Sequence, residues 1–144
     1  MTRRSSLLAL LGFLLARPLG ALAAWNEQAF GAKTAADALK GIGASGAAPS
    51  KDIVIDAPQI AENGAVVPIE ISSNVPGTSA IAVVIEKNPF PLAGRFEFKE
   101  GALPFVKLNV KMSETSDVRV VAFAGGKQFS AAREIKVTIG GCGG

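Results

Sequence analysis

Residues 118–139 read VRVVAFAGGKQFSAAREIKVTI, two apolar stretches that meet at a pair of glycines. The second stretch alternates apolar and polar residues from Ile135 to Ile139, which is the pattern of a strand with one buried face. Gly125 and Gly126 suit a tight turn, because both central positions of such a turn favour a positive φ. The stretch therefore predicts a β-hairpin with strands at Val118–Ala124 and Gln128–Ile139.

The same period of two continues upstream of this hairpin. Turn signals rich in Asn, Pro and Gly separate the apolar stretches. Short strands of this kind predict a mainly β fold, an immunoglobulin-like antiparallel β-sandwich. Pro68 lies inside one stretch and predicts an edge or a bulge there, because proline cannot donate to the strand ladder. The upstream strands are predicted at Ile53–Asp56, Val66–Ser72, Ala80–Glu86, Arg95–Phe98 and Val106–Met112.

An amphipathic helix is predicted before the strands, from Trp25 to Lys40. Its apolar residues recur at a spacing that places them on one face. Gly41 to Pro49 is rich in small residues and predicts a flexible linker. The residues expected on the apolar face are Phe30, Ala35, Ala38 and Leu39.

Residues 1–23 predict an export signal. Arg3 and Arg4 give it a basic start, and the apolar run Leu7–Ala16 follows. That run of about ten residues is too short to span a bilayer, which needs roughly 20. The paired arginines favour the twin-arginine route. We therefore expect four segments: the signal at 1–23, a helix and linker at 24–48, a β-sandwich at 49–139 and an arm at 140–144.

The composition excludes several kinds of chemistry. The 144 residues contain no His and a single Cys, so His-dependent nucleophile pairs, His or multi-Cys metal sites and internal disulfides are excluded. Loss of the signal would remove three arginines and no acid, which leaves twelve basic and twelve acidic residues. A balanced charge predicts neither a nucleic-acid nor a membrane partner. We therefore expect no catalytic residue, no metal and no cofactor.

The candidate site is Cys142, which follows the last predicted strand. Two glycines flank it on each side, and glycine gives backbone freedom without side-chain bulk. Five extended residues reach at most about 17 Å. No nearby group favours the thiolate, so we expect the active site of a partner to activate the sulfur. The pattern predicts covalent attachment at Cys142 on a swinging arm made of Gly140, Gly141, Gly143 and Gly144.

This terminal stretch, from Ile139 to Gly144, resembles the swinging arm of the SoxY family, the sulfur carriers of periplasmic thiosulfate oxidation. The leader resembles that family too, as do the stretches Lys33–Leu39, Ile60–Pro68 and Asn88-Pro89. The resemblance implies a periplasmic sulfur carrier rather than an enzyme, with Cys142 as the carrier cysteine and no bound metal. It also implies a heterodimer with SoxZ, a second sandwich protein that lacks the arm.

Further partners are implied by the same resemblance. A c-type cytochrome enzyme, SoxAX, would couple thiosulfate to the thiol, and a dimanganese hydrolase, SoxB, would then release sulfate and leave a persulfide. A sulfane dehydrogenase, SoxCD, would oxidise the outer sulfur where it is present.

Two other interpretations fit the residues. A secreted β-sandwich could act as an interaction module that dimerises through a Cys142 disulfide. A one-cysteine thiol peroxidase would need a cation beside the sulfur, and Arg133 is the candidate. The fate of the thiol distinguishes them, because only a carrier forms and releases sulfur adducts.

Overall fold

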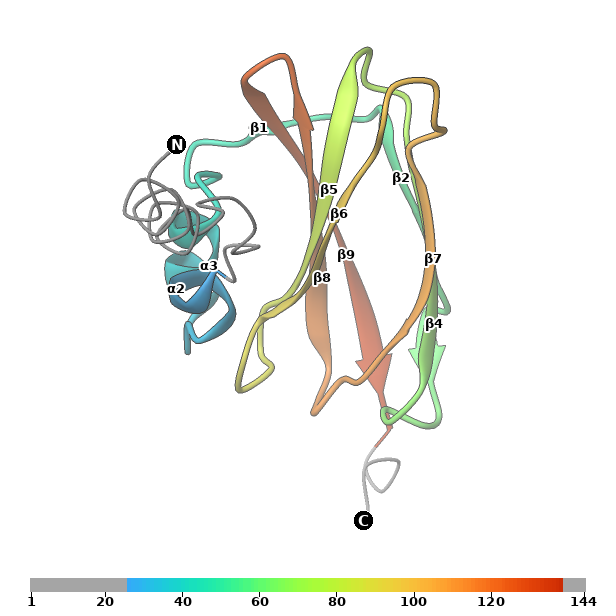
Figure 1. The fold of residues 1–144 in the computed structure, drawn as a ribbon. Helices are drawn as coiled ribbons and strands as arrows, with labels where there is room; N and C mark the ends of the chain where they lie inside the picture. Colours follow the sequence, from blue (N-terminus) through green and yellow to red (C-terminus); the bar gives the residue numbers. More distant parts are fainter. Residues whose placement is uncertain (1–25, 139–144) are drawn as a thin grey trace, which may run out of the picture.

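The computed structural model describes residues 26–138 of the chain. The predicted export signal, Trp25, Cys142 and the four arm glycines lie outside the described residues. The described part is mainly β, with two short helices at its amino-terminal end (Figure 1). None of its helices is long and apolar enough to cross a membrane.

The described strands form two sheets. They are β1 (Ala48–Pro49), β2 (Ile53–Asp56), β3 (Ile60–Ala61), β4 (Val67–Ser73), β5 (Thr78–Ile85), β6 (Leu92–Glu97), β7 (Phe105–Val110), β8 (Ser116–Ala124) and β9 (Lys127–Val137). The larger sheet has the order β1-β9-β8-β5-β6, and β3 also pairs with β9. The smaller sheet has the order β2-β4-β7 and packs face to face with the larger one (Figure 1).

The predicted strands are all present, as β2 and β4 to β9. Gly125 and Gly126 form the predicted hairpin turn with φ of 56° and 76°. Pro68 lies beyond the last pair between β2 and β4, Asp56 with Glu70, so β4 is an edge at the proline, as expected. The sequence did not predict β1 and β3, two residues each, which are strands only because they run parallel beside β9.

The main core lies between the two sheets. The smaller sheet contributes a row of buried aliphatic side chains, and the larger sheet contributes the facing row. Burial of this apolar surface is the main favourable contribution to folding. Fully buried members include Val67, Ile69, Ile71, Ile81, Val83, Val118, Val120, Met112 and Ile135.

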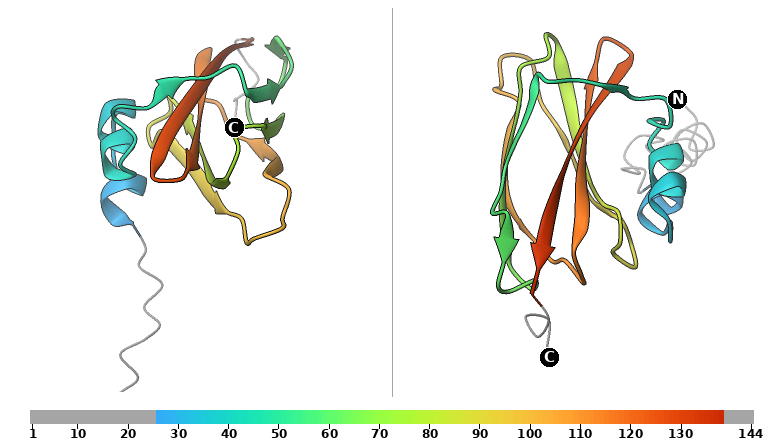
Figure 2. Two further views of the ribbon diagram at one scale, coloured as in Figure 1. Left: turned by 90° about the horizontal axis from the view of Figure 1, so that it is seen from above. Right: turned by 180° about the vertical axis from the view of Figure 1, so that it is seen from behind.

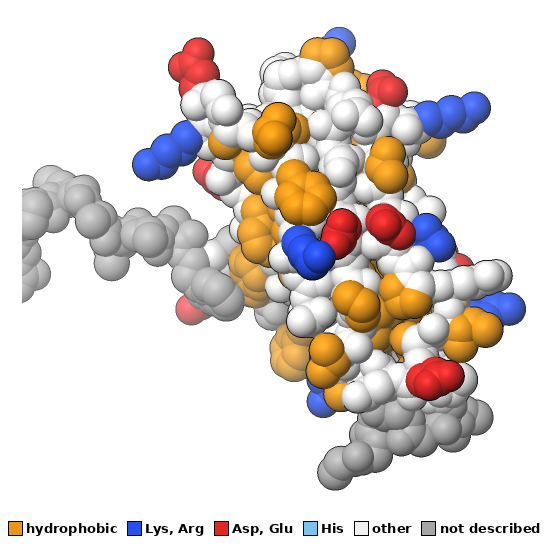
Figure 3. Space-filling view, turned by 90° about the vertical axis from the view of Figure 1, so that its right-hand side faces the viewer, with side chains coloured by type: hydrophobic (Ala, Val, Ile, Leu, Met, Phe, Trp, Pro, Cys, Tyr) orange, Lys and Arg blue, Asp and Glu red, His pale blue; other side chains and the backbone are white. Residues whose placement is uncertain are grey.

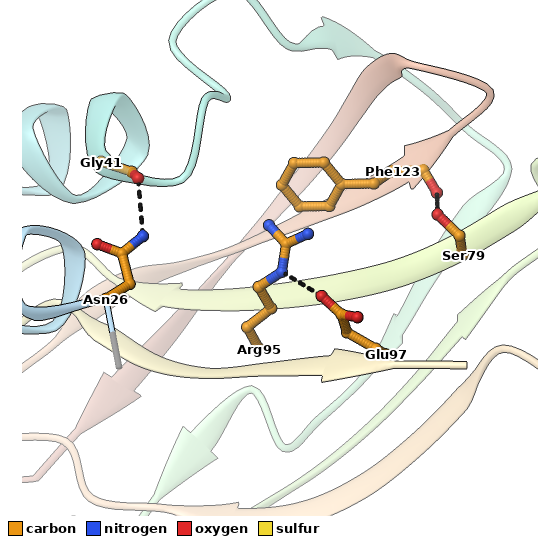
Figure 4. A network of polar contacts seen from close by, with 6 residues as sticks. All are labelled: Asn26, Gly41, Ser79, Arg95, Glu97 and Phe123. Carbon is orange, nitrogen blue, oxygen red and sulfur yellow. Dashed lines mark hydrogen bonds and ion pairs between the residues drawn. The ribbon is translucent and has the colours of Figure 1, made fainter. Parts of the chain in front are cut away.

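The prediction of one helix from Trp25 to Lys40 is wrong. The described chain forms α2 (Glu27–Phe30) and α3 (Ala35–Gly41) instead. Thr34 starts the second helix, because its side-chain oxygen accepts a hydrogen bond from Asp37 N at 3.1 Å. Asn26 caps α2 in the same way and donates to Gly41 O at 2.9 Å, which joins the start of one helix to the end of the other (Figure 4).

The helices cover the outer face of the larger sheet (Figure 2). A second buried cluster fills this contact, with Ala29 and Ala38 from the helices against Val84 and Val121 from the sheet. Two cation–π contacts border it: Lys33 Nζ lies 3.5 Å from the Phe90 ring centre, and Arg95 lies over Phe123 at 4.3 Å (Figure 4).

The segment predicted as a flexible linker is packed. Ile42 and Ala44 are buried in the cluster under the helices, and Ala48–Pro49 pair with β9 as β1. Gly41 lies so close to Ala29 that a Cβ on it would meet the Ala29 Cα at 2.8 Å. Small residues therefore serve close packing here, which composition alone does not distinguish from a loose linker.

The outer face of the smaller sheet carries no such cover from the described residues. Val54 and Phe105 are 49% and 48% exposed on it, and Glu70 pairs with Lys107 between neighbouring strands. Figure 3 looks onto this side of the molecule and shows hydrophobic and charged side chains mixed over the surface.

Candidate functional site

The described part of the candidate site is the carboxyl end of β9, which leads toward Cys142. Cys142 itself and Gly140, Gly141, Gly143 and Gly144 lie outside the described residues, so their predicted roles stay predictions. The structure does place the point from which that segment continues, at Thr138. That point lies at the opposite end of the larger sheet from the β8–β9 hairpin (Figure 1).

On one side, the end of β9 is held by β3. Lys136 pairs with Ile60 and Val137 with Ala61 in a parallel ladder. Lys136 N donates to Gln59 O at 3.0 Å, and Thr138 N donates to Ala61 O at 3.1 Å. The Thr138 hydroxyl also donates, to Glu62 O at 3.2 Å. The backbone is thus fixed on this side as far as Thr138.

On the β8 side, the end of β9 is held by a side chain. β8 begins at Ser116, which pairs with Ile135, so its ladder does not reach Val137. Val137 N donates instead to Thr115 Oγ1 at 2.9 Å, and the same hydroxyl lies 3.5 Å from Val137 O. The Thr115 hydroxyl can make both contacts, because a hydroxyl group both donates and accepts hydrogen bonds.

The loops around this end are linked to one another. Asn88 Nδ2 donates to Lys111 O at 2.6 Å, and its Oδ1 accepts from Ser113 N at 3.0 Å. Met112 N donates to Gly64 O at 2.7 Å, which joins the β7–β8 loop to the β3–β4 loop. Ile135, close to this end of β9, is fully buried in the core. The end of β9 is therefore part of a rigid base.

Sequence analysis missed Thr115 and Asn88. Neither residue was assigned a role at the site. Asn next to Pro between two strands is a signal for a side chain that bonds nearby backbone. No local pattern identifies Thr115, because its partner lies 22 residues away.

The charged side chains around this end are exposed and of both signs: Glu62, Lys111, Glu114 and Lys136. Among residues 26–138 no group of three or more His, Cys, Asp or Glu is placed to hold a metal ion. Arg133, the cation that a peroxidase would need, donates through Nη1 to Ile55 O at 3.0 Å. Its guanidinium thus joins β9 to β2 of the facing sheet.

Similarity to known proteins complements this geometry. The family model of the sulfur oxidation protein SoxY matches residues 39–142, a range that ends on the cysteine. The solved structure of the sulfur carrier protein SoxY from Chlorobium limicola f thiosulfatophilum is 37% identical. The match covers 79% of this chain and 100% of that chain, with a TM-score of 0.68.

More distant structures share the fold alone. A superoxide reductase (neelaredoxin) from Ignicoccus hospitalis is 21% identical over 60% of this chain and 80% of that chain, with a TM-score of 0.53. No curated protein matches the sequence. The family match spans more than half of the chain, and the similar SoxY structure is covered along its full length. The chain therefore belongs to the SoxY family of sulfur oxidation proteins.

Proposed function

We propose that this protein is a periplasmic sulfur carrier that holds groups derived from thiosulfate on Cys142. The observation that carries the proposal is the SoxY family match through residue 142, where the sole thiol of the chain stands between pairs of glycines. Residues 1–23 export the protein, by the twin-arginine route. The protein is not itself a catalyst, because partner enzymes supply the chemistry.

The sulfur cycle begins with an oxidative coupling. The Cys142 thiol and thiosulfate form a new S–S bond, giving Cys–S–S–SO₃⁻; the thiol proton is released, and two electrons pass to the c-type cytochrome enzyme SoxAX. Water then cleaves the bond between the outer sulfur and the sulfonate in the hydrolase SoxB. This step releases sulfate and leaves Cys–S–SH. Where SoxCD is present, it oxidises the outer sulfur to a sulfonate with oxygen atoms from water and takes up the six electrons that are released. A further hydrolysis then releases this group as sulfate and returns the free thiol.

The body and the arm divide the work of such a carrier. The backbone is held by hydrogen bonds as far as Thr138, and Cys142 follows four residues later. Four extended residues span at most about 14 Å. The glycines add no side-chain bulk. The sulfur thus enters a narrow enzyme pocket while the folded body stays outside.

The body is also the part that binds the partner subunit. We propose an immunoglobulin-like sandwich, supported by the facing strand orders β2-β4-β7 and β9-β8-β5-β6. A SoxZ-type protein forms the heterodimer with it. SoxAX and SoxB, and SoxCD where present, act on the complex.

The test is to identify the group carried on the thiol. The mature protein is isolated with its SoxZ partner from cells oxidising thiosulfate, and its intact mass is measured with and without reductant. We expect thiosulfonate and persulfide adducts on the wild type. Cys142→Ser should carry none and should melt at the wild-type temperature.

Two results would contradict the proposal. One is an unmodified thiol during active thiosulfate oxidation. The other is a stable Cys142–Cys142 dimer that carries no adduct, together with loss of partner binding in Cys142→Ser, which would favour the interaction module.

A further inference from the structure

β7 lies at one end of the smaller sheet, whose order is β2-β4-β7 (Figure 1). It pairs with β4 on one side, and no strand of residues 26–138 lies on its other side. A free strand edge is a template for another chain, because its backbone donors and acceptors have no partner within the fold. A bulge, a proline or a covering side chain usually makes such an edge unsuitable for pairing. An edge with none of these features is open to a partner strand.

The other outer strands of the two sheets are less open. At β2, Arg133 Nη1 donates to Ile55 O at 3.0 Å and so occupies a backbone acceptor. At β6, the pairing with β5 shifts register between Val83 and Val84, which interrupts the ladder. β1 and β3 are only two residues long. The ladder between β4 and β7 runs without a shift along the whole of β7, so β7 is the long regular edge of the described fold.

The backbone groups on the open edge of β7 belong to Lys107 and Asn109. Ser73 N donates to Pro104 O at 3.0 Å, so these two residues form a hydrogen-bonded pair of the ladder between β4 and β7. Bonded pairs recur at every second residue of an antiparallel ladder. The even-numbered residues of β7 therefore bond β4, and the N–H and C=O groups of Lys107 and Asn109 point away from it.

The side chains of β7 leave this edge accessible. A lysine on an edge normally discourages pairing. Lys107 is the one charged residue of β7, but its ammonium group pairs with Glu70 on β4, which holds the charge over the sheet. Leu108 on the inner face is only partly buried, and Phe105 on the outer face is 48% exposed. Apolar surface thus borders the free backbone groups on both faces.

We propose that a second copy of this chain pairs with β7 in an antiparallel arrangement. The two smaller sheets then form one continuous sheet across a two-fold axis, and the same residues make the contact in both copies. A second copy is the occupant because β7 is complementary to itself. This contact is additional to the SoxZ heterodimer and does not depend on the sulfur chemistry.

One register of β7 with itself fits the charges. The outward backbone groups of both copies must face each other, which leaves two registers that align most of the strand. In one of them Lys107 lies opposite Lys107 of the second copy, and like charges directly opposite are destabilising. In the other, Leu108 lies opposite Leu108 of the second copy, and Lys107 faces the neutral Asn109. Val106 then faces Val110 in the same apolar row, so the second register is favoured on both faces.

The favoured register places Leu108 beside the two-fold axis. Its backbone groups bond β4, so the two Leu108 residues form a pair without mutual hydrogen bonds, with Cα atoms about 4.5 Å apart. A disulfide spans a Cα separation of about 4.4–6.8 Å. The two Asn109 residues are displaced from each other along the strands, so their Cα atoms lie roughly 8 Å or more apart. A cysteine at 108 therefore forms a disulfide between copies, and a cysteine at 109 does not.

The first test places single thiols on this edge in the Cys142→Ser background. Leu108→Cys and its matched control Asn109→Cys are each prepared as the complete mature chain with its SoxZ partner. Both are oxidised with copper phenanthroline, and disulfide dimers of this chain are measured on non-reducing gels. We expect about tenfold or more dimer for Leu108→Cys than for Asn109→Cys, because only the first pair has disulfide geometry. Random collision would favour the control, since Asn109 is the more exposed residue.

The second test blocks the backbone pairing. Asn109→Pro removes an N–H that points away from β4, so the ladder within the fold stays intact. Asn109→Ala keeps the N–H and is the control. Light scattering of the complexes should show association of the wild type and Asn109→Ala below about 1 mM. Asn109→Pro should associate about tenfold or more weakly, because the symmetric contact loses the bond twice.

A third variant tests the charge pattern and does not depend on the fold of the proline variant. Asn109→Lys places a lysine opposite Lys107 of the second copy. Association should weaken at low salt and recover as salt is added, because like charges then screen each other less strongly from pairing. A salt-independent effect, or none, would contradict the register.

Three results would overturn the proposal. They are a wild-type complex that does not associate up to about 1 mM, equal cross-linking at positions 108 and 109, and loss of SoxZ binding in a folded Asn109→Pro. The last result would show that SoxZ occupies β7. A wild type that binds no SoxZ would count against the proposed heterodimer, while the cross-linking of this chain would still report on the β7 contact.

Discussion

Two strands of similar length, β4 and β5, differ in how many of their faces are buried. β4 alternates buried and more exposed residues, and its sequence VPIEISS alternates in the same way. From Ala80 to Ile85 every residue of β5 is buried, and the sequence there is a continuous apolar run. The difference arises because α2 and α3 cover the outer face of β5, whereas none of the described residues covers that of β4.

The comparison shows that a strand's sequence records what lies on each side of it. A half-buried strand needs polar residues on every second position, and a strand covered on both faces does not. The apolar run at residues 80–85 therefore indicates by itself that both faces of this strand are covered. Three changes test this contrast, from the largest expected effect to the smallest.

The largest effect is expected from a charge placed under the helices. Val121→Asp introduces a carboxyl group into the fully buried cluster between the helices and the larger sheet. We expect a loss of about 3 kcal/mol or more in the free energy of unfolding, because the group loses its hydration. Val54→Asp, on the exposed face, should change that free energy by less than about 0.5 kcal/mol. Urea unfolding of both variants checks this, and equal losses would mean that the helices do not cover the sheet in solution.

A smaller effect is expected where the two helices touch. Gly41→Ala adds a Cβ that would lie 2.8 Å from Ala29 Cα, a backbone atom that cannot move aside cheaply. We expect a loss of about 1–3 kcal/mol. Gly46→Ala is the control, because a Cβ there meets nothing within 4 Å and should be neutral or stabilise by up to about 1 kcal/mol. Thermal unfolding of both variants measures these changes in stability. A neutral Gly41→Ala would contradict the close approach of Gly41 to Ala29.

The smallest effect concerns the ion pair on the exposed face. The hydrogen bond and charge of Glu70 raise the pKa of Lys107 above its ordinary value of 10.5. Because the pKa of Lys107 is higher in the folded protein than in the unfolded chain, protonation of this lysine stabilises the fold. The contribution is complete at pH values below the pKa in the unfolded chain, and it is lost as the pH rises through the pKa in the folded protein. The small advantage of the wild type over Glu70→Gln in melting temperature should therefore be constant up to about pH 9 and be lost as the pH rises beyond 10.5, through the raised pKa of Lys107.

The control for this pH series is the pair of Arg119 with Glu86, at 2.8 Å. An arginine side chain stays charged across this range, so the effect of Glu86→Gln should not vary with pH in the same way. A pH-independent difference for Glu70→Gln would show that the lysine charge is not its cause.

Apolar periodicity explains both why the strands were predicted correctly and why the two helices were predicted as one. Strands such as β4 repeat a period of two over several residues, which only one backbone geometry satisfies. The helical region also has a consistent apolar spacing, yet the chain breaks at 31–34 because Thr34 begins a new helix. Thr34 and Asn26 are ordinary N-cap residues, so the capping signal was present and was outweighed by periodicity.

The amino-acid sequence by itself determined the β fold, its hairpin and the candidate thiol, because period two, paired glycines and a lone cysteine are local signals. Only the tertiary structure decided how the base of the arm is held. Thr115 and Val137 lie 22 residues apart, and Asn88 reaches Lys111 and Ser113 across 23 and 25 residues. Such contacts depend on where β8 stops relative to β9, which is settled by packing of the whole core and by no short stretch of sequence.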